Sequence, residues 1–137
     1  MSWLLDTNVL SEIRKRERAN PRVQAWLADT PEDDLFTSAL VIGEVRRGVE
    51  LMRRRDVPSA LALEQWLARL KTTFSDRVLP IDARVAERWA MLNVPDRLPT
   101  VDSLLAATAL VHDITLVTRN VRDFERTGVP LLDPWTA

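Results

Sequence analysis

The sequence contains no cysteine and only one histidine, His112, among its 137 residues. The absence of cysteine excludes disulfides, thiolate nucleophiles and cysteine-ligated zinc. A single histidine excludes a metal site that is built from several imidazoles. The chain also has only three glycines, so it contains no glycine-rich loop of the kind that holds nucleotide phosphates. Any metal site in this chain therefore has to rely on oxygen ligands.

The sequence also lacks long hydrophobic runs and an excess of charge of either sign. No apolar segment approaches the length that spans a bilayer, and the N-terminus does not resemble a secretion signal. The formal net charge of −1 provides no overall attraction to nucleic acid or membranes. Hydrophobic residues make up 46% of the chain and charged residues 28%, as in ordinary globular proteins. We expect a cytoplasmic protein without a membrane partner, folded as one domain over residues 1–137.

Short apolar segments alternate with amphipathic ones along the whole chain. The apolar segments are predicted to be strands at residues 3–5, 35–37, 78–81, 114–117 and 129–132. The predicted helices cover about 7–18, a segment from 21 onward, 39–54, 59–74, 83–92 and 101–111. Strands that alternate with helices are typical of a mainly parallel sheet with helices on both faces. The predicted fold class is therefore α/β.

The first predicted strand, Trp3-Leu4-Leu5, ends at the carboxylate of Asp6. Ligands of open α/β folds bind at the carboxyl edge of a parallel sheet, and Asp6 is expected at that edge. An Asp at this position also commonly caps the helix that follows. The segment alone leaves both interpretations open.

Further acids occupy positions that local structure does not fully explain. Glu44 lies at the border of an apolar helix face, and Asp102 is the only charge of an otherwise apolar helix. Asn120 and Asp123 follow the strand at 114–117. A parallel sheet can bring these side chains to the same edge as Asp6.

Carboxylates that share a partly dry site repel one another and stay ionised only if a cation offsets them. Oxygen ligands favour Mg²⁺ or Mn²⁺, and such an ion can activate water for attack on a phosphodiester. Each residue also has a simpler explanation. Asp102 suits the first turn of a helix, Asn120 suits a turn, and Glu44 and Asp123 can be solvated surface charges.

Four segments in combination resemble the signature of the PIN-domain ribonucleases. They are residues 4–10 (Leu-Leu-Asp-Thr-Asn-Val-Leu), residues 37–48 with Thr-Ser-Ala and Gly-Glu-Val, residues 102–109 with an Asp before Leu-Leu-Ala-Ala-Thr-Ala, and residues 116–124 with Leu-Val-Thr-Arg-Asn before Asp-Phe. The resemblance covers the whole chain. Within this family, the sequence is most similar in size and motifs to the VapC-type toxins of toxin–antitoxin systems, in particular to their FitB-like branch.

This resemblance implies a three-layer α/β/α sandwich and a metal-dependent endoribonuclease. It implies that Asp6, Glu44 and Asp102 bind Mg²⁺ or Mn²⁺. It also implies an RNA substrate, a cognate antitoxin and a homodimer or higher homo-oligomer. The polar side chains expected to support the carboxylates or a water molecule are Thr7, Asn8, Ser38 and Thr118.

The sequence departs from the family pattern at the fourth acid of the pocket. Asn120 stands where that acid is expected, directly after Thr118-Arg119, and Asp123 follows three residues later. Asn120 would contact a metal-bound water, or Asp123 would supply the charge. The sequence leaves this choice open.

All but two of the 19 basic residues are arginines. Arg119 and Arg122 lie close in sequence to the proposed pocket, and Arg47 follows Glu44. These three are candidate contacts to RNA phosphates, although any one arginine also suits a solvated helix face.

Two other functions compete with the nuclease. A phosphotransfer domain would use Asp6 as its nucleophile, but Asn8 stands where a phosphatase of the haloacid dehalogenase type needs a second acid. A catalytically weak or inactive PIN-like binding domain is the other alternative, and Asn120 keeps it open.

Overall fold

The computed structural model describes all residues 1–137, which form a five-stranded sheet in the order β3-β2-β1-β4-β5. Every pair of neighbouring strands is parallel, so the predicted parallel sheet is confirmed. The strands are β1 (Trp3–Leu5), β2 (Leu35–Ser38), β3 (Val78–Leu79), β4 (Thr115–Val117) and β5 (Leu131–Leu132).

The two edge strands are shorter than predicted. The prediction extended β3 to residue 81 and began β5 at residue 129, whereas each strand has two residues. Pro80 follows β3 directly and Pro130 precedes β5. Proline has no amide hydrogen to donate to a neighbouring strand, which is why it occurs at strand ends and on edge strands.

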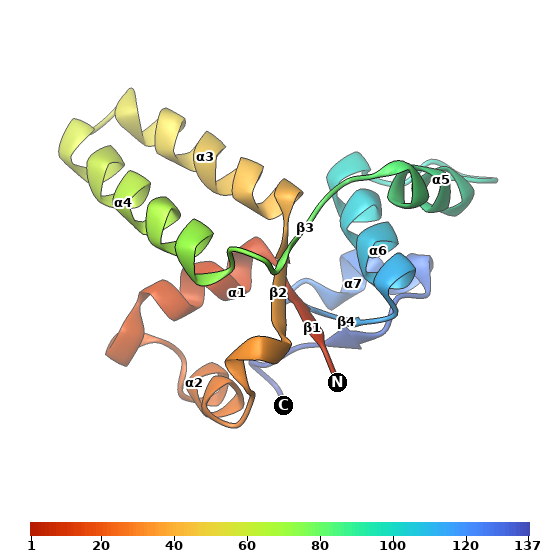
Figure 1. Cartoon of the computed structure of the whole chain (residues 1–137), viewed down its shortest axis with the longest axis horizontal. Helices are drawn as coiled ribbons and strands as arrows, with labels where there is room; N and C mark the ends of the chain where they lie inside the picture. Colours follow the sequence, from red (N-terminus) through yellow and green to blue (C-terminus); the bar gives the residue numbers. More distant parts are fainter.

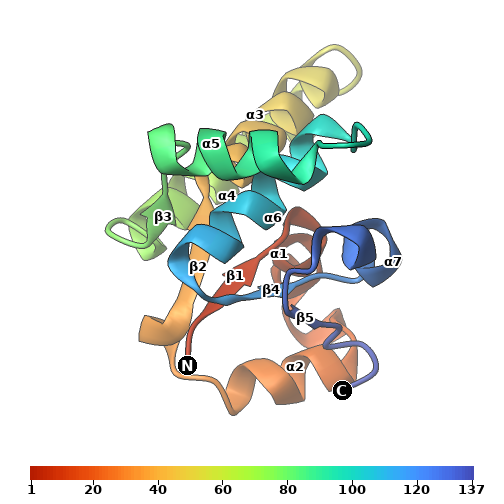
Figure 2. The same ribbon diagram turned by 90° about the vertical axis from the view of Figure 1, so that its right-hand side faces the viewer.

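Helices cover both faces of the sheet, which confirms the three-layer arrangement (Figure 1). One layer contains α1 (Thr7–Arg14), α2 (Pro21–Ala28), α3 (Ala39–Arg53) and α4 (Val57–Thr73). The other layer contains α5 (Ala83–Leu92), α6 (Thr100–His112) and α7 (Val121–Phe124). Figure 2 shows α5 and α6 in front of the strands, with α1 behind them. None of these helices combines the length and the apolar character that crossing a membrane requires.

Side-chain caps explain where several helices begin. The Ser38 hydroxyl accepts a hydrogen bond from the Leu40 amide at 3.0 Å and starts α3, as predicted. The predicted start of α4 at residue 59 is wrong, because Asp56 caps the helix and α4 begins at Val57. Pro58 therefore lies in the first turn, where a missing amide hydrogen costs no helical hydrogen bond.

The first helix ends earlier than its charged sequence predicts. We predicted a helix to residue 18, but α1 ends at Arg14 and Arg16 has a φ of 55°. The cause is Glu12, which is buried and accepts hydrogen bonds from the Asn20 amide at 2.8 Å and from Lys15 at 3.0 Å. These two donors hold the pKa of Glu12 below its usual value. Glu12 thus fixes the return of the chain and has a structural role.

The core lies on both faces of the central strands. Leu4, Leu5, Leu116 and Val117 in β1 and β4 are fully buried. The helix α6 supplies mostly small side chains, which let it pack closely against the sheet. This packing fixes the central strands and therefore the positions of the residues that follow them.

Candidate active site

The order in which strands are added to the sheet reverses between β1 and β4, because β2 and β3 lie on one side of β1, whereas β4 and β5 lie on the other. The crevice at the carboxyl ends of β1 and β4 is therefore where α/β folds bind ligands. Leu5 and Val117 pair in register, and the Asp6 amide donates to the Val117 carbonyl at 3.0 Å. The next residue of each strand, Asp6 and Thr118, is therefore placed at this crevice.

The hydroxyl of Thr118 connects three segments at this point. It donates to Oδ2 of Asp6 at 2.8 Å. It also accepts hydrogen bonds from Nδ2 of Asn8 at 3.2 Å and from the Asn120 amide at 3.1 Å. Thr118 is fully buried and Asp6 nearly so, so Oδ2 of Asp6 has little water to replace this hydroxyl. The predicted supporting residues Asn8 and Thr118 thus hold Asp6 in a fixed orientation.

Asp6 is both a helix cap and a member of the acidic site. Its Oδ1 accepts a hydrogen bond from the Thr7 amide at 2.7 Å, which starts α1. The side chain is only 9% exposed. The two interpretations of Asp6 that the sequence left open therefore hold together. Because both oxygens already accept hydrogen bonds, the carboxylate is placed better as a fixed ligand than as a phosphate-accepting nucleophile.

Glu44 joins the site from another helix. The Thr7 hydroxyl donates to Oε1 of Glu44 at 2.8 Å, across 37 residues of sequence. This bond connects the start of α1 to α3 and places Glu44 beside the Asp6 segment. Glu44 is exposed, so its carboxylate faces the solvent side of the crevice.

The acids of the site influence one another electrostatically. Burial raises the pKa of Asp6, its hydrogen bonds oppose this change, and the charge of Glu44 raises it further. Burial also raises the pKa of Asp102, followed by the charges of Asp6 and Asp123. The negative charges of Glu44 and Asp123 thus act on Asp6 and Asp102, which brings carboxylates from four parts of the chain into one electrostatic environment.

The donor set fits a hard divalent cation in its chemistry, because every available ligand is an oxygen and two carboxylates are partly dehydrated. The side chains do not close around one point, however, and no three of them stand together as an ion site. Carboxylates that repel one another favour such a spread. Asp102 accepts no hydrogen bond that would hold its side chain where it stands.

The remaining predicted site residues lie at different distances from this group. The Ser38 hydroxyl is occupied as the cap of α3. Asn120 contributes its backbone amide, and its exposed side chain makes no hydrogen bond. Asp123 is also exposed, but its charge acts on Asp102. Of the two candidates for the fourth acid, Asp123 is the one that contributes to the electrostatics of the site.

The arginines of α3 are of two kinds, and only one of these residues is a candidate contact to RNA. Arg46 and Arg53 form ion pairs with Glu50 and Glu64 at 2.6–3.2 Å, so acids already neutralise them. In contrast, Arg47 has no acidic side chain within ion-pair distance.

The two arginines near α7 also lack ion pairs but differ in their contacts. The guanidinium of Arg119 lies over the ring of Trp135, 5.1 Å from its centroid. Arg122 is exposed.

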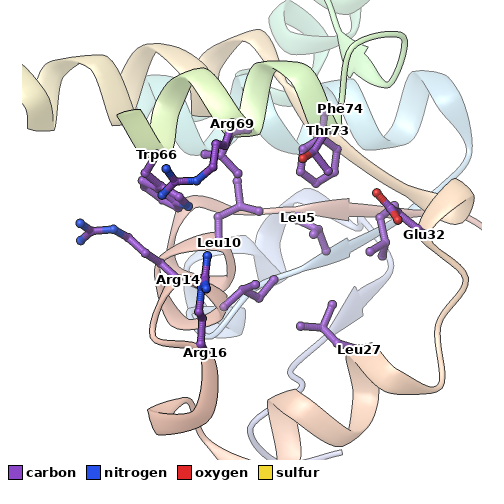
Figure 3. A pocket seen from close by; sticks show the side chains of 13 residues that line it. Leu5, Leu10, Arg14, Arg16, Leu27, Glu32, Trp66, Arg69, Thr73 and Phe74 are labelled. Atoms are coloured by element: carbon purple, nitrogen blue, oxygen red, sulfur yellow. The ribbon is translucent and has the colours of Figure 1, made fainter. Parts of the chain in front are cut away.

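The surface has two hollows of interest, one beside the acidic site and one away from it. One, of about 420 Å³, is lined by Glu44 and Arg47 together with apolar side chains. The other, of about 390 Å³, lies among α1, α2, α4 and β2, away from the acids (Figure 3). Its walls are mostly apolar, and Arg14, Arg16 and Arg69 point along one side of it.

Sequence patterns missed the hollow beside Glu44. It combines Gly43 with Ile81 and Val101, which lie far apart in the sequence. The exposure of two β-branched side chains next to an acidic site is its only signal, and that exposure becomes visible only in three dimensions.

An all-parallel sheet between two helical layers, with coupled carboxylates at the crevice between β1 and β4, defines the PIN-like class of α/β proteins. The model of the PIN domain family matches residues 3–130. The chain therefore belongs to the PIN domain family.

Known proteins extend this relationship over the whole chain. Toxin FitB of Neisseria gonorrhoeae is 35% identical over 139 residues, covering 96% of this chain and 97% of that protein. VapC ribonuclease Y4jK of Sinorhizobium fredii is 31% identical over 140 residues, covering 96% of each. The crystal structure of FitAcB from Neisseria gonorrhoeae matches with a TM-score of 0.88 and 33% identity, covering 98% of this chain and 99% of that one.

Proposed function

We propose that this protein is the toxin of a toxin–antitoxin pair and acts as a metal-dependent endoribonuclease in the cytoplasm. The observation that carries the proposal is the placement of Asp6 at the end of β1, where Thr7 bonds to both Asp6 and Glu44 and the charge of Asp6 acts on Asp102. Relatives with the names toxin and ribonuclease, similar over nearly their whole length, support it. The resemblance to VapC-type toxins also makes a homodimer or higher homo-oligomer part of the proposal.

Asp6, Glu44 and Asp102 would hold Mg²⁺ or Mn²⁺. When bound, such an ion polarises a phosphodiester and makes a water molecule a better nucleophile. The chain itself supplies the orientation. Thr118 fixes Oδ2 of Asp6 and Thr7 fixes Oε1 of Glu44, so neither carboxylate has to be ordered when the ion binds.

RNA cleavage by the purified protein is expected only with Mg²⁺ or Mn²⁺, because the carboxylates alone supply no Lewis acid to polarise the phosphate. EDTA is expected to stop cleavage and added metal to restore it, as measured on a labelled RNA by gel electrophoresis. Matched preparations of Asp6→Asn and Glu44→Gln control for contaminating nucleases and are expected to be inactive. Cleavage that continues undiminished in EDTA would overturn the proposed chemistry.

Asp123→Ala is expected to slow cleavage about tenfold. The charge of Asp123 acts on Asp102, and loss of one such charge weakens binding of a cation by roughly that factor. Asn120→Ala is expected to change the rate less than about threefold, because the Asn120 side chain makes no hydrogen bond. The measurement is kcat/KM as a function of Mg²⁺ concentration. If neither variant is slower, the site uses only three acids; if Asn120→Ala is the slower one, the assignment of Asp123 is wrong.

The antitoxin of the pair needs a surface on this chain. The groove of Figure 3 suits an apolar segment with acidic side chains, because apolar walls carry three arginines and only one acid, Glu32. Apolar grooves of this kind bind amphipathic helices in many complexes. We propose this groove as the antitoxin surface.

A further inference from the structure

The hollow beside Glu44 is formed by three separate segments. The first turns of α3 form one wall, Ile81 before α5 forms another, and Val101 in the first turn of α6 forms a third. Its volume is about 420 Å³, within the range of small-molecule pockets. The residues that line it are Ala39, Leu40, Gly43, Glu44, Arg47, Ile81 and Val101.

This hollow adjoins the acidic site on two sides. Glu44 lines it and also binds the hydroxyl of Thr7, next to Asp6. Val101 lines it and precedes Asp102 in the same helical turn. A molecule in the hollow would therefore contact Glu44, one of the carboxylates proposed to hold the metal, and the residue that precedes Asp102.

Its walls combine exposed apolar surface with one free positive charge. Ile81 is 37% exposed and Val101 is 42% exposed, although both are β-branched side chains that favour burial. Arg47 is the one cation in the wall, and it has no ion-pair partner. Apolar walls suit the faces of a flat ring, and an unpaired guanidinium suits a phosphate.

We propose that this hollow binds the nucleobase of a nucleotide next to the cleaved phosphate, and that Arg47 binds a phosphate of the same strand. The proposal rests on the proposed ribonuclease function and adds a specificity site to it. Single-stranded RNA can turn a base out of its stack into such a pocket, whereas a base-paired strand cannot. The substrate is therefore a single-stranded segment of RNA.

Gly43 offers a way to fill the hollow without touching an acid. A Cβ atom built on Gly43 meets nothing within 4 Å, and Gly43 lines the hollow. Gly48 is in the same helix and has equally open space, but it is not part of the hollow. Because a side chain favours the helix equally at the two positions, Gly48→Leu is a matched control for Gly43→Leu.

Three RNA substrates are compared. One is an oligonucleotide that the wild type cleaves, and the other two are copies of it with a single abasic nucleotide, placed before the cut in one copy and after it in the other. The wild type is expected to lose about tenfold in kcat/KM on one abasic copy, because the apolar surface of the missing base is no longer buried. Gly43→Leu is expected to be about tenfold slower on the intact RNA and to lose this discrimination. Gly48→Leu is expected to behave like the wild type.

A binding measurement separates this inference from the proposed function. Fluorescence anisotropy of the same labelled RNAs in EDTA reports affinity without cleavage. Gly43→Leu is expected to weaken binding of the intact RNA but not of the abasic copy that lacks the bound base. If the wild type cleaves the intact RNA but binds and cleaves both abasic copies equally well, the ribonuclease function holds and the inference fails. If Gly43→Leu and Gly48→Leu bind and cleave alike, the inference is wrong. A change of oligomeric state in Gly43→Leu alone, measured by light scattering, would also overturn it, because the hollow would then be an interface between copies.

Discussion

Replacing Asp102 with asparagine is expected to abolish RNA cleavage and to make the metal-free protein more stable. Loss of one of the three carboxylates proposed to hold the metal is expected to lower kcat/KM at least about 1,000-fold. The stability gain has a separate cause. Burial and the charges of Asp6 and Asp123 raise the pKa of Asp102, so its negative charge is unfavourable in the folded protein.

The dependence on pH follows from the direction of that change. Because the pKa of Asp102 is higher in the folded than in the unfolded protein, stability falls as the pH rises from the unfolded pKa through the folded one. The cost is therefore fully present above both pKa values and disappears below the unfolded one. Asparagine has no charge, and the melting temperature in EDTA is expected to rise by about 2 °C, after solvent screening of this half-exposed side chain.

Thermal unfolding in EDTA over a series of pH values from 7 downward measures this effect. The difference between Asp102→Asn and wild type is expected to shrink as the pH falls through the folded pKa toward the unfolded one. Asp33→Asn is the matched control, since Asp33 is exposed and forms no ion pair. Saturating Mg²⁺ is expected to raise the melting temperature of the wild type and to have less effect on Asp102→Asn. A lower melting temperature for Asp102→Asn than for wild type in EDTA would show that the negative charge of Asp102 does not destabilise the folded protein.

The acids could be found from the sequence because each stands at the end of an element that the hydrophobic pattern defines. A strand that ends at Asp6 and an apolar helix that begins beside Asp102 require only local patterns. The parallel sheet then places strand ends at one edge, whatever the details of the loops. The position of Glu44 was harder to interpret, because its partner Thr7 is 37 residues away.

Contacts among distant side chains explain what the sequence could not show. The end of α1 depends on the hydrogen bonds that Glu12 accepts from Asn20 and Lys15. The helix propensity of residues 15–18 does not predict these bonds. The hollow beside Glu44 depends on how α3, α5 and α6 meet. The choice between Asn120 and Asp123 depends on side-chain placement around a short helix, which residue order does not determine.

Thr118→Val is expected to destabilise the protein by about 2–4 kcal/mol, because the change leaves three polar groups without their partner. Valine has nearly the shape of threonine, so packing is kept while Oδ2 of Asp6, Nδ2 of Asn8 and the Asn120 amide lose the hydroxyl. The melting temperature is expected to fall by roughly 6–12 °C. Urea unfolding and thermal melts measure the two quantities.

Two controls isolate the hydroxyl from the methyl group. Thr118→Ser keeps the hydroxyl and is expected to recover most of the stability. Thr37→Val makes the same exchange at the end of the neighbouring strand β2, where the threonine is equally buried but its hydroxyl lies 3.5 Å from the Leu5 carbonyl, at the limit of a hydrogen bond. This variant is expected to cost much less than Thr118→Val. Equal losses for the two valine variants would mean that the bonds of Thr118 do not hold Asp6 in place. The proposed metal binding by a preorganised carboxylate would then lose its physical basis.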